Sequence, residues 1–92
     1  MRFEWNQAKN ESNIRKPGVD FADVEDMFNH PILTLQDDRK DYGEDRWIAI
    51  GRLQSLICVV IYTERPGDVL RIISARKATQ HEIQRYEKRI KN

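Results

Sequence analysis

Two apolar runs separated by a Pro-Gly turn most constrain how this chain can fold. They cover residues 56–63 and 69–76, and both are rich in β-branched and aliphatic residues. This pattern predicts two antiparallel strands joined by a hairpin. Because neither run alternates cleanly between apolar and polar residues, we expect both strands to be covered on two faces at the centre of a small sheet.

Three arginines lie within the predicted hairpin, namely Arg65, Arg71 and Arg76. Apolar strands that end in cations are typical of a rigid platform that presents positive charge to a polyanion. The plainer interpretation is a sheet core with solvated ends, and the hairpin taken by itself favours that one.

The distribution of charge favours a dipolar surface. The 92 residues carry a net charge of +1, but residues 1–45 contain six Lys/Arg and eleven Asp/Glu, whereas residues 46–92 contain ten and four. The basic half would suit nucleic acid or an acidic partner. Alternatively, the two halves neutralise each other across the fold. The length indicates one domain over residues 1–92.

No membrane association is expected. No run approaches the ~20 apolar residues that span a bilayer, and the first residues show no signal-peptide pattern. The lone Cys58 lies inside an apolar run, which is typical of a small buried hydrophobe in a reducing compartment. We therefore expect a cytoplasmic protein.

Capping signals divide the chain into elements. Asn6 and Asp20 are helix caps, and Thr79 with Glu82 forms a capping box. Helices are predicted over residues 6–16, from 20 to a stop at His30-Pro31, and from 79 onward. Strands are predicted over 2–5, 32–36, 46–52, 56–63 and 69–75. The order β-α-α-β-β-β-β-α predicts an α+β fold with a small curved antiparallel sheet.

Regular hairpins would place several charged residues in one row. If position 52 faces 56 and position 64 faces 69, Arg46 lies opposite Tyr62, and Tyr62 lies opposite Arg71. Arg65 lies at the nearby hairpin tip. On this register Arg76 falls near residue 57, apart from the row, and a slip of one residue would reverse every face.

The available side chains exclude most hydrolytic chemistries. The acidic loop over residues 37–45 matches no calcium-binding spacing and contains no histidine, so we expect no metal site and no cofactor. Both histidines are predicted at helix ends and Cys58 in the core, which argues against a nucleophile-histidine pair. Metal-free RNA cleavage stays open, because arginines bind phosphate bidentately and stabilise developing charge, although composition alone favours a plain binding domain. Tyr42 or Tyr62 would stack on a splayed base.

Fragments spread over nearly the whole chain resemble one known family. They are Phe3-Glu4-Trp5-Asn6 with Lys9 and Asn13, Lys16-x-Gly18-Val19-x-Phe21, Gly43-Glu44-x-Arg46, Ile50-Gly51, Tyr62-Thr63-x-Arg65, and Arg71-Ile72-Ile73-Ser74-Ala75-Arg76 with Glu82 and Tyr86. In this order and at these spacings they resemble the BrnT toxins of type II toxin–antitoxin pairs.

The resemblance implies a RelE-like ribonuclease fold and a metal-independent endoribonuclease that inhibits translation by cutting RNA. It implies a BrnA-like antitoxin as the protein partner, with operator DNA bound only through that antitoxin. The residues it selects as catalytic are Lys16, Glu44, Arg46, Arg65 and Arg76, with Tyr42, Tyr62 and Arg71 as further RNA-binding candidates. The cations would bind phosphate, and Glu44 would act as a base or orient an arginine. The alternative for each is structural: an ion pair, a cap or a solvated turn.

One position departs from the family pattern. Pro17 stands between Lys16 and Gly18 where the family has a histidine, and proline neither titrates nor donates a hydrogen bond. If that histidine transfers a proton, its loss weakens cleavage by roughly 10²–10⁴-fold. The chain is therefore either an attenuated ribonuclease or a non-catalytic module that binds the antitoxin and acts in operon autoregulation.

Overall fold

The computed structural model describes residues 1–16 and 18–91. Its elements in chain order are β1 (Arg2–Glu4), α1 (Gln7–Arg15), the 3-10 helix η1 (Phe21–Asp23), α2 (Val24–Met27), β2 (Ile32–Gln36), β3 (Trp47–Leu53), β4 (Leu56–Arg65), β5 (Val69–Lys77) and α3 (Gln80–Lys91). Among the helices in this part of the chain, none is both long and apolar enough to cross a membrane.

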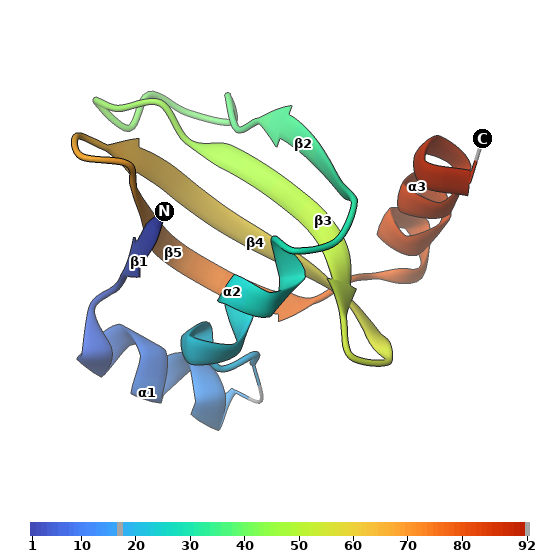
Figure 1. The fold of residues 1–92 in the computed structure, drawn as a ribbon, viewed down its shortest axis with the longest axis horizontal. Helices are drawn as coiled ribbons and strands as arrows, with labels where there is room; N and C mark the ends of the chain where they lie inside the picture. Colours follow the sequence, from blue (N-terminus) through green and yellow to red (C-terminus); the bar gives the residue numbers. More distant parts are fainter. Residues whose placement is uncertain (17, 92) are drawn as a thin grey trace.

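The five strands of the described residues form one sheet in the order β1-β5-β4-β3-β2 (Figure 1). The α+β class is confirmed, but the predicted antiparallel sheet is wrong at one edge, since β1 runs parallel to β5. The other neighbouring strands are antiparallel. A strand of three residues carries no local signal for its direction or its partner, so the sequence pattern could not reveal this pairing.

The predicted helix caps are present. The Asn6 side chain accepts a hydrogen bond from the backbone N–H of Lys9, and Asp20 accepts one from Ala22. The second helical segment is shorter than expected and begins as the 3-10 turn η1 before it continues as α2. Thr79 and Glu82 exchange both hydrogen bonds of a capping box at the start of α3.

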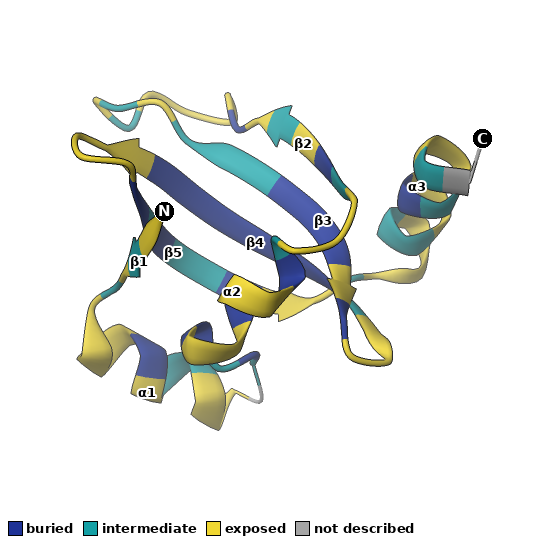
Figure 2. Ribbon diagram, viewed as in Figure 1, coloured by how far each residue is buried: buried dark blue, intermediate teal, exposed yellow. Residues whose placement is uncertain are grey.

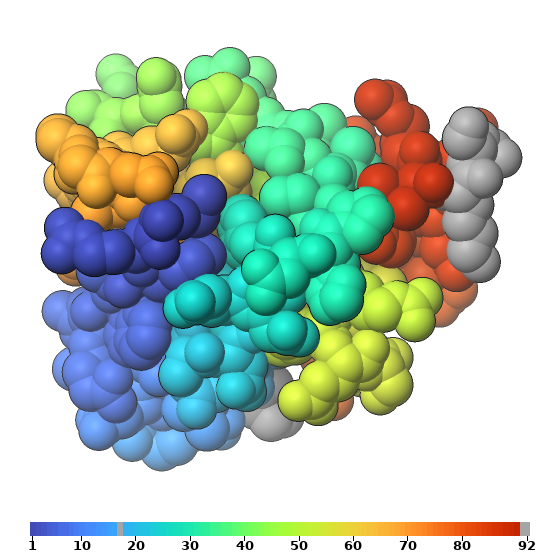
Figure 3. Space-filling model, viewed as in Figure 1, coloured from blue at the N-terminus to red at the C-terminus, as the bar shows by residue number. Residues whose placement is uncertain are grey.

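The first core lies between the sheet and the N-terminal helices. In Figure 1, α2 lies in front of the strands and α1 lies below them, and Figure 3 shows teal residues covering the middle of the sheet in the same view. The apolar residues buried there are Val19, Phe21, Val24, Met27, Ala49, Leu53, Cys58, Val60, Tyr62, Leu70, Ile72 and Ala75. Strand β4 is dark blue along its middle in Figure 2, as expected for the central strand.

The opposite face is divided into an apolar end and a charged end. Helix α3 packs Tyr86 and Ile90 against a cluster that contains Leu33, Ile50 and Val59, and Tyr86 donates a hydrogen bond to the Pro31 carbonyl (3.1 Å). In Figure 1, α3 lies at the other end of the sheet from the β4–β5 turn. Toward that turn the strands on this face carry charged side chains instead of aliphatic ones.

Next to their turns, both hairpins differ from the predicted register by one residue, and beyond a register shift between Ile61 and Tyr62 the β4–β5 pairing differs by two. The β3–β4 hairpin closes at Leu53 opposite Leu56, and its two-residue turn places Gln54 at a φ of 56°. Trp47, not Arg46, therefore faces Tyr62. The β4–β5 hairpin closes at Arg65 opposite Val69 and places Thr63 opposite Arg71. Turn length sets the register, and both predicted turns were one residue too long.

Asn13 ties Gly18 and Val19 to the sheet. Its side-chain amide donates to the carbonyl oxygens of Val19 and Ala75, both at 2.8 Å, and its own carbonyl accepts from Gly18 (2.7 Å). A Cβ atom at Gly18 would collide with Asn13, so the glycine permits this close approach.

We therefore predict that Asn13→Ala lowers the free energy of unfolding by about 1–2 kcal/mol, because two part-buried carbonyls lose their donor, with a small offset from the helix propensity of alanine. Urea denaturation measures this change. Asn29→Ala, at an exposed position after α2, is the matched control and should change stability by less than about 0.5 kcal/mol. Equal effects of the two substitutions would contradict the proposed tie.

Candidate active site

Three arginines meet at the charged end of the sheet face, and we call Arg46, Arg65 and Arg71 the arginine row. Since Trp47 faces Tyr62, Arg46 lies level with Thr63, which faces Arg71 across β5. Arg65 is two residues along β4 and so projects on the same face as Thr63. All three side chains are partly exposed, from 25% for Arg46 to 45% for Arg65.

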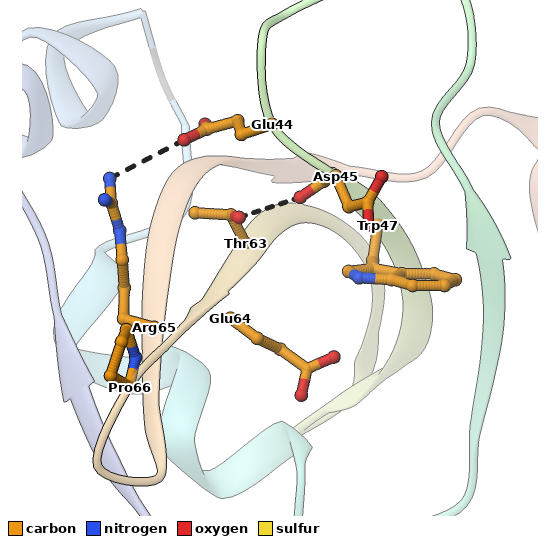
Figure 4. Close-up of a pocket in the computed structure, with 7 residues that line it drawn as sticks. All are labelled: Glu44, Asp45, Trp47, Thr63, Glu64, Arg65 and Pro66. Atoms are coloured by element: carbon orange, nitrogen blue, oxygen red, sulfur yellow. Dashed lines mark hydrogen bonds and ion pairs between the residues drawn. The ribbon is translucent and has the colours of Figure 1, made fainter.

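Glu44 joins two members of the row. Its carboxylate accepts a hydrogen bond from Nε of Arg46 (3.2 Å) and lies 3.7 Å from a terminal nitrogen of Arg65. Figure 4 shows the Arg65 side chain extending from β4 toward Glu44, while Glu64 points away from both. Thr63 donates to the Asp45 carbonyl (2.7 Å), which holds the loop that carries Glu44 against β4.

These residues border a cavity of about 320 Å³ at the ends of β3 and β4. It is lined by Glu44, Asp45, Trp47, Thr63, Glu64, Arg65 and Pro66 (Figure 4). Charged groups from the loop before β3 and from the end of β4 therefore share one solvent-accessible recess.

The third arginine of the row has its own acidic partner, and a lysine lies close by. Arg71 donates to the Glu4 carboxylate at 2.7 Å. The pKa of Lys9 is lowered, first by burial and then by the positive charges of Arg46 and Arg71. Lys9 of α1 thus lies close enough to two arginines of the row to interact with them. Its position in a polar helix offered no sequence signal beyond its place in the family fragment.

Tyr42 and Tyr62 have different surroundings. The Arg46 guanidinium lies over the Tyr42 ring, 4.0 Å from its centroid, so Tyr42 is part of the site. The expected exposure of Tyr62 is wrong: its ring is buried on the other face, 5.5 Å from that of Phe28 in an edge-to-face contact. The one-residue shift of the β3–β4 hairpin accounts for this change of face.

Arg76 lies apart from the row. It faces Val59, six residues along β4 from Arg65, which corresponds to about 20 Å of strand. Both of its terminal nitrogens donate to Glu82 at 2.8 Å. Arg76 thereby links β5 to the first turn of α3. The predicted separation of Arg76 from Arg65 is confirmed, although it faces residue 59 and not residue 57.

Lys16 also lies away from the row. It caps the C-terminal end of α1 and is exposed, and its backbone N–H donates to Asn13. Because Asn13 binds the Ala75 carbonyl, this end of α1 is beside the Arg76 end of β5. Pro17, where the chain departs from the family pattern, lies outside the described residues.

Other reactive groups have structural surroundings. Cys58 is buried in the first core, and burial raises the pKa of its thiol. His30 is exposed at the end of α2, with Nε2 3.9 Å from Asp26. Within the described residues, no group of three or more His, Cys, Asp or Glu side chains is arranged to hold a metal ion.

Comparison with known proteins identifies the family. The family model of the BrnT ribonuclease toxins of type II toxin–antitoxin systems matches residues 5–82. The chain belongs to the BrnT family. The crystal structure of the Brucella abortus ribonuclease toxin BrnT is similar, with 31% sequence identity and a TM-score of 0.64 over 87% of this chain and 99% of that one. No curated protein sequence matches the chain.

The structure divides the residues selected by the BrnT resemblance into two groups. Glu44, Arg46 and Arg65 are joined by ion pairs, whereas Arg76 and Lys16 lie near the other end of β5. Lys9 and Glu4 were not among the selected residues, yet both interact with members of the arginine row. The BrnT fragments therefore contain residues of the site and residues that join α3 and α1 to the sheet.

The link between β5 and α3 should show a characteristic pH dependence. The hydrogen bonds from Arg76 lower the pKa of Glu82 from 4.5 to about 2. A carboxylate with a lowered pKa stabilises the fold above its unfolded value and loses this contribution as the pH falls toward the folded value. Because Arg76 is half exposed, solvent screening limits the contribution to about 1 kcal/mol.

We predict that Glu82→Gln lowers the free energy of unfolding by about 1 kcal/mol at pH 7, and that this difference shrinks between pH 4.5 and pH 2. Chemical denaturation of both proteins across this range measures it. Glu11→Gln, an exposed position on α1, serves as the control. A difference that stayed constant with pH would show that the Glu82 charge contributes nothing.

Proposed function

We propose that this BrnT-family chain is a metal-independent endoribonuclease and that the arginine row is its phosphate-binding site. The observation that carries the proposal is the bridge from Glu44 to both Arg46 and Arg65. It brings Arg46, from the loop before β3, together with Arg65, at the end of β4, beside the recess that Arg65 lines. Permanently charged, bidentate donors in fixed positions are suited to a phosphate whose negative charge grows during reaction.

In the proposed reaction, the 2′-hydroxyl of a ribose attacks the adjacent phosphorus. A new O–P bond forms, the bond to the 5′-oxygen breaks, and the products are a cyclic phosphate and a free 5′-hydroxyl. Water takes up the proton that leaves the 2′-oxygen and supplies the proton that is added to the 5′-oxygen. Arg46 and Arg65 stabilise the phosphoryl oxygens, and the contacts of Glu44 favour a role in orienting them.

Lys9 and Arg71 add positive charge beside this pair. Burial and the charges of Arg46 and Arg71 lower the pKa of Lys9. We assign to Arg71, held by Glu4, a contact with a neighbouring phosphate.

The wider role follows from family membership. A ribonuclease toxin of a type II system has an RNA substrate and an antitoxin partner. We propose a BrnA-like antitoxin for this chain, contact with operator DNA through that antitoxin alone, and inhibition of translation in the cytoplasm. The order of strands and helices also supports assignment to RelE-like ribonucleases.

We predict that purified protein cleaves total RNA in EDTA, and that Arg46→Ala or Arg65→Ala lowers the cleavage rate about 10²–10³-fold by removing one transition-state donor. Gel analysis with a labelled transcript measures the rates. Arg89→Ala removes an equivalent charge from the exposed side of α3 and should leave the rate within about threefold. Arg76→Ala should lower the cleavage rate less than about tenfold, measured on protein that has been shown to be folded.

The same assay tests the alternative function. A wild-type chain that cleaves no RNA but binds the protein encoded beside its gene tightly would be a non-catalytic module acting in autoregulation. Cleavage that EDTA abolishes would instead contradict metal independence. A rate that falls as much in Arg89→Ala as in Arg46→Ala would show only a general dependence on positive charge.

Pro17 yields a separate prediction, because the family pattern has a titratable histidine at this position. Pro17→His should increase RNA cleavage, by roughly 10²-fold if the histidine restores general acid–base catalysis, and should slow the growth of cells that express it. Pro17→Ala controls for the loss of the proline ring. Equal cleavage by the histidine and alanine variants would exclude proton transfer at this position.

A further inference from the structure

The loop between β2 and β3 is built around one covered carboxylate. The Asp37 side chain is 0% exposed. Nε and a terminal nitrogen of Arg39 donate to its two oxygens at 2.7 and 2.9 Å, and the Tyr42 hydroxyl donates at 3.3 Å. The sequence showed only a cluster of acidic residues here, without a metal-binding spacing. Asp37 instead holds two side chains of its own loop in place.

The same loop ends at Arg46. The backbone N–H of Asp37 donates to the Arg46 carbonyl at 2.8 Å, so the first and last residues of the loop are paired across β2 and β3. Asp37 can therefore anchor Tyr42 beside the base of the Arg46 side chain. Arg39 lowers the pKa of Asp37 to about 2, and the carboxylate stays charged at neutral pH.

Two contacts hold the Arg46 guanidinium. Its plane lies over the Tyr42 ring, with Cζ 4.0 Å from the ring centroid, and its Nε donates to Glu44 at 3.2 Å. The ring contact restricts the tilt of the guanidinium, and the Glu44 contact restricts its rotation. Neither contact uses the two terminal nitrogens, which form the edge that grips a phosphate.

We propose that Tyr42, anchored by Asp37, is a positioning residue that preorganises Arg46 for phosphate binding. The inference rests on the proposed ribonuclease function for its catalytic consequence. It replaces the base-stacking role expected for Tyr42, because the ring is already covered by Arg46 and also has the Lys40 ammonium 5.2 Å from its centroid. A small displacement of a positioned group lowers the rate of reaction more than it weakens binding.

Steady-state cleavage of a labelled RNA by a matched set of variants tests the proposal. Tyr42→Leu removes the ring, and Tyr42→Phe keeps the ring but removes the hydroxyl that reaches Asp37. We expect Tyr42→Leu to lower kcat by about 10²-fold while KM changes by less than about threefold. Tyr42→Phe should lower kcat roughly tenfold or less, because the ring can still lie under the guanidinium.

A double-mutant cycle separates positioning from base stacking. In an Arg46→Ala background, Tyr42→Leu should cause no further loss, because there is no guanidinium left to orient. A stacking role predicts the opposite: weaker binding of RNA, by about tenfold, with kcat unchanged and with the same loss whether or not Arg46 is present. That result would overturn the proposal.

A second readout does not depend on cleavage. In the 15N-labelled protein without RNA, the Nε–Hε resonance of Arg46 should show the ring-current shift of a proton held beside Tyr42. The shift should persist in Tyr42→Phe and disappear in Tyr42→Leu, while the Arg71 resonance stays unchanged. If the wild type cleaves no RNA, the proposed function fails, and this measurement still decides whether Tyr42 orients Arg46. An Arg46 resonance that is identical in all three proteins overturns the positioning role.

If Tyr42→Leu does not fold, the same measurements are made on Asp37→Asn. It keeps the ring and Arg46 but weakens the anchor formed with Arg39 and Tyr42. We expect a lower kcat with KM nearly unchanged, and a broadened Arg46 resonance. Full activity together with an unchanged resonance would show that Asp37 does not act through Tyr42.

Discussion

The pairing of β4 with its two neighbours is the constraint on which the rest of the structure depends. Of the ten residues of β4, residues 56–62 pair with β3 and residues 58–65 pair with β5. Turns of two and three residues set the registers next to the turns, and the β4–β5 register shifts once more between Ile61 and Tyr62. Alternation along β4 then assigns its side chains to the two faces. Thr63 and Arg65 go to the charged face, and Tyr62 goes to the core. A shift of one residue would bury the arginines and expose the aromatic ring.

The sequence predicted the features that depend on nearby residues, namely helix starts and central strands. It did not predict strand direction and register, which depend on contacts between distant segments. The caps at Asn6, Asp20 and Thr79 mark helix starts because each depends on a hydrogen bond within a few residues. The apolar runs identified the central strands for the same reason. Direction and register depend on contacts between distant segments, so the parallel pairing of β1 and the exact hairpin turns did not follow from the pattern.

The candidate site was predictable to the extent that its parts lie close together in the chain or meet across adjacent strands. Glu44 and Arg46 are two residues apart, and Arg65 reaches them through the β3–β4 hairpin. The family fragments also contain residues that serve the fold. Gly51 lets β3 approach α2, since a Cβ there would lie 3.0 Å from Met27, and Arg76 holds α3 through Glu82. Lys9 comes from a helix, and nothing in the local pattern showed that it interacts with the row.

The acidic and basic halves of the chain form ion pairs with each other at the candidate site. Among the described ion pairs, Glu4 with Arg71 and Glu44 with Arg46 and Arg65 join the acidic N-terminal half to the basic C-terminal half. The halves do partly neutralise each other, as the plainer interpretation held, but they do so at the arginine row. The carboxylates reduce the general attraction for polyanions and also fix the directions in which the arginines point. Such a site favours a phosphate that fits the preset guanidinium positions over any negatively charged surface, because non-specific attraction depends on uncompensated charge, whereas bidentate recognition depends on orientation.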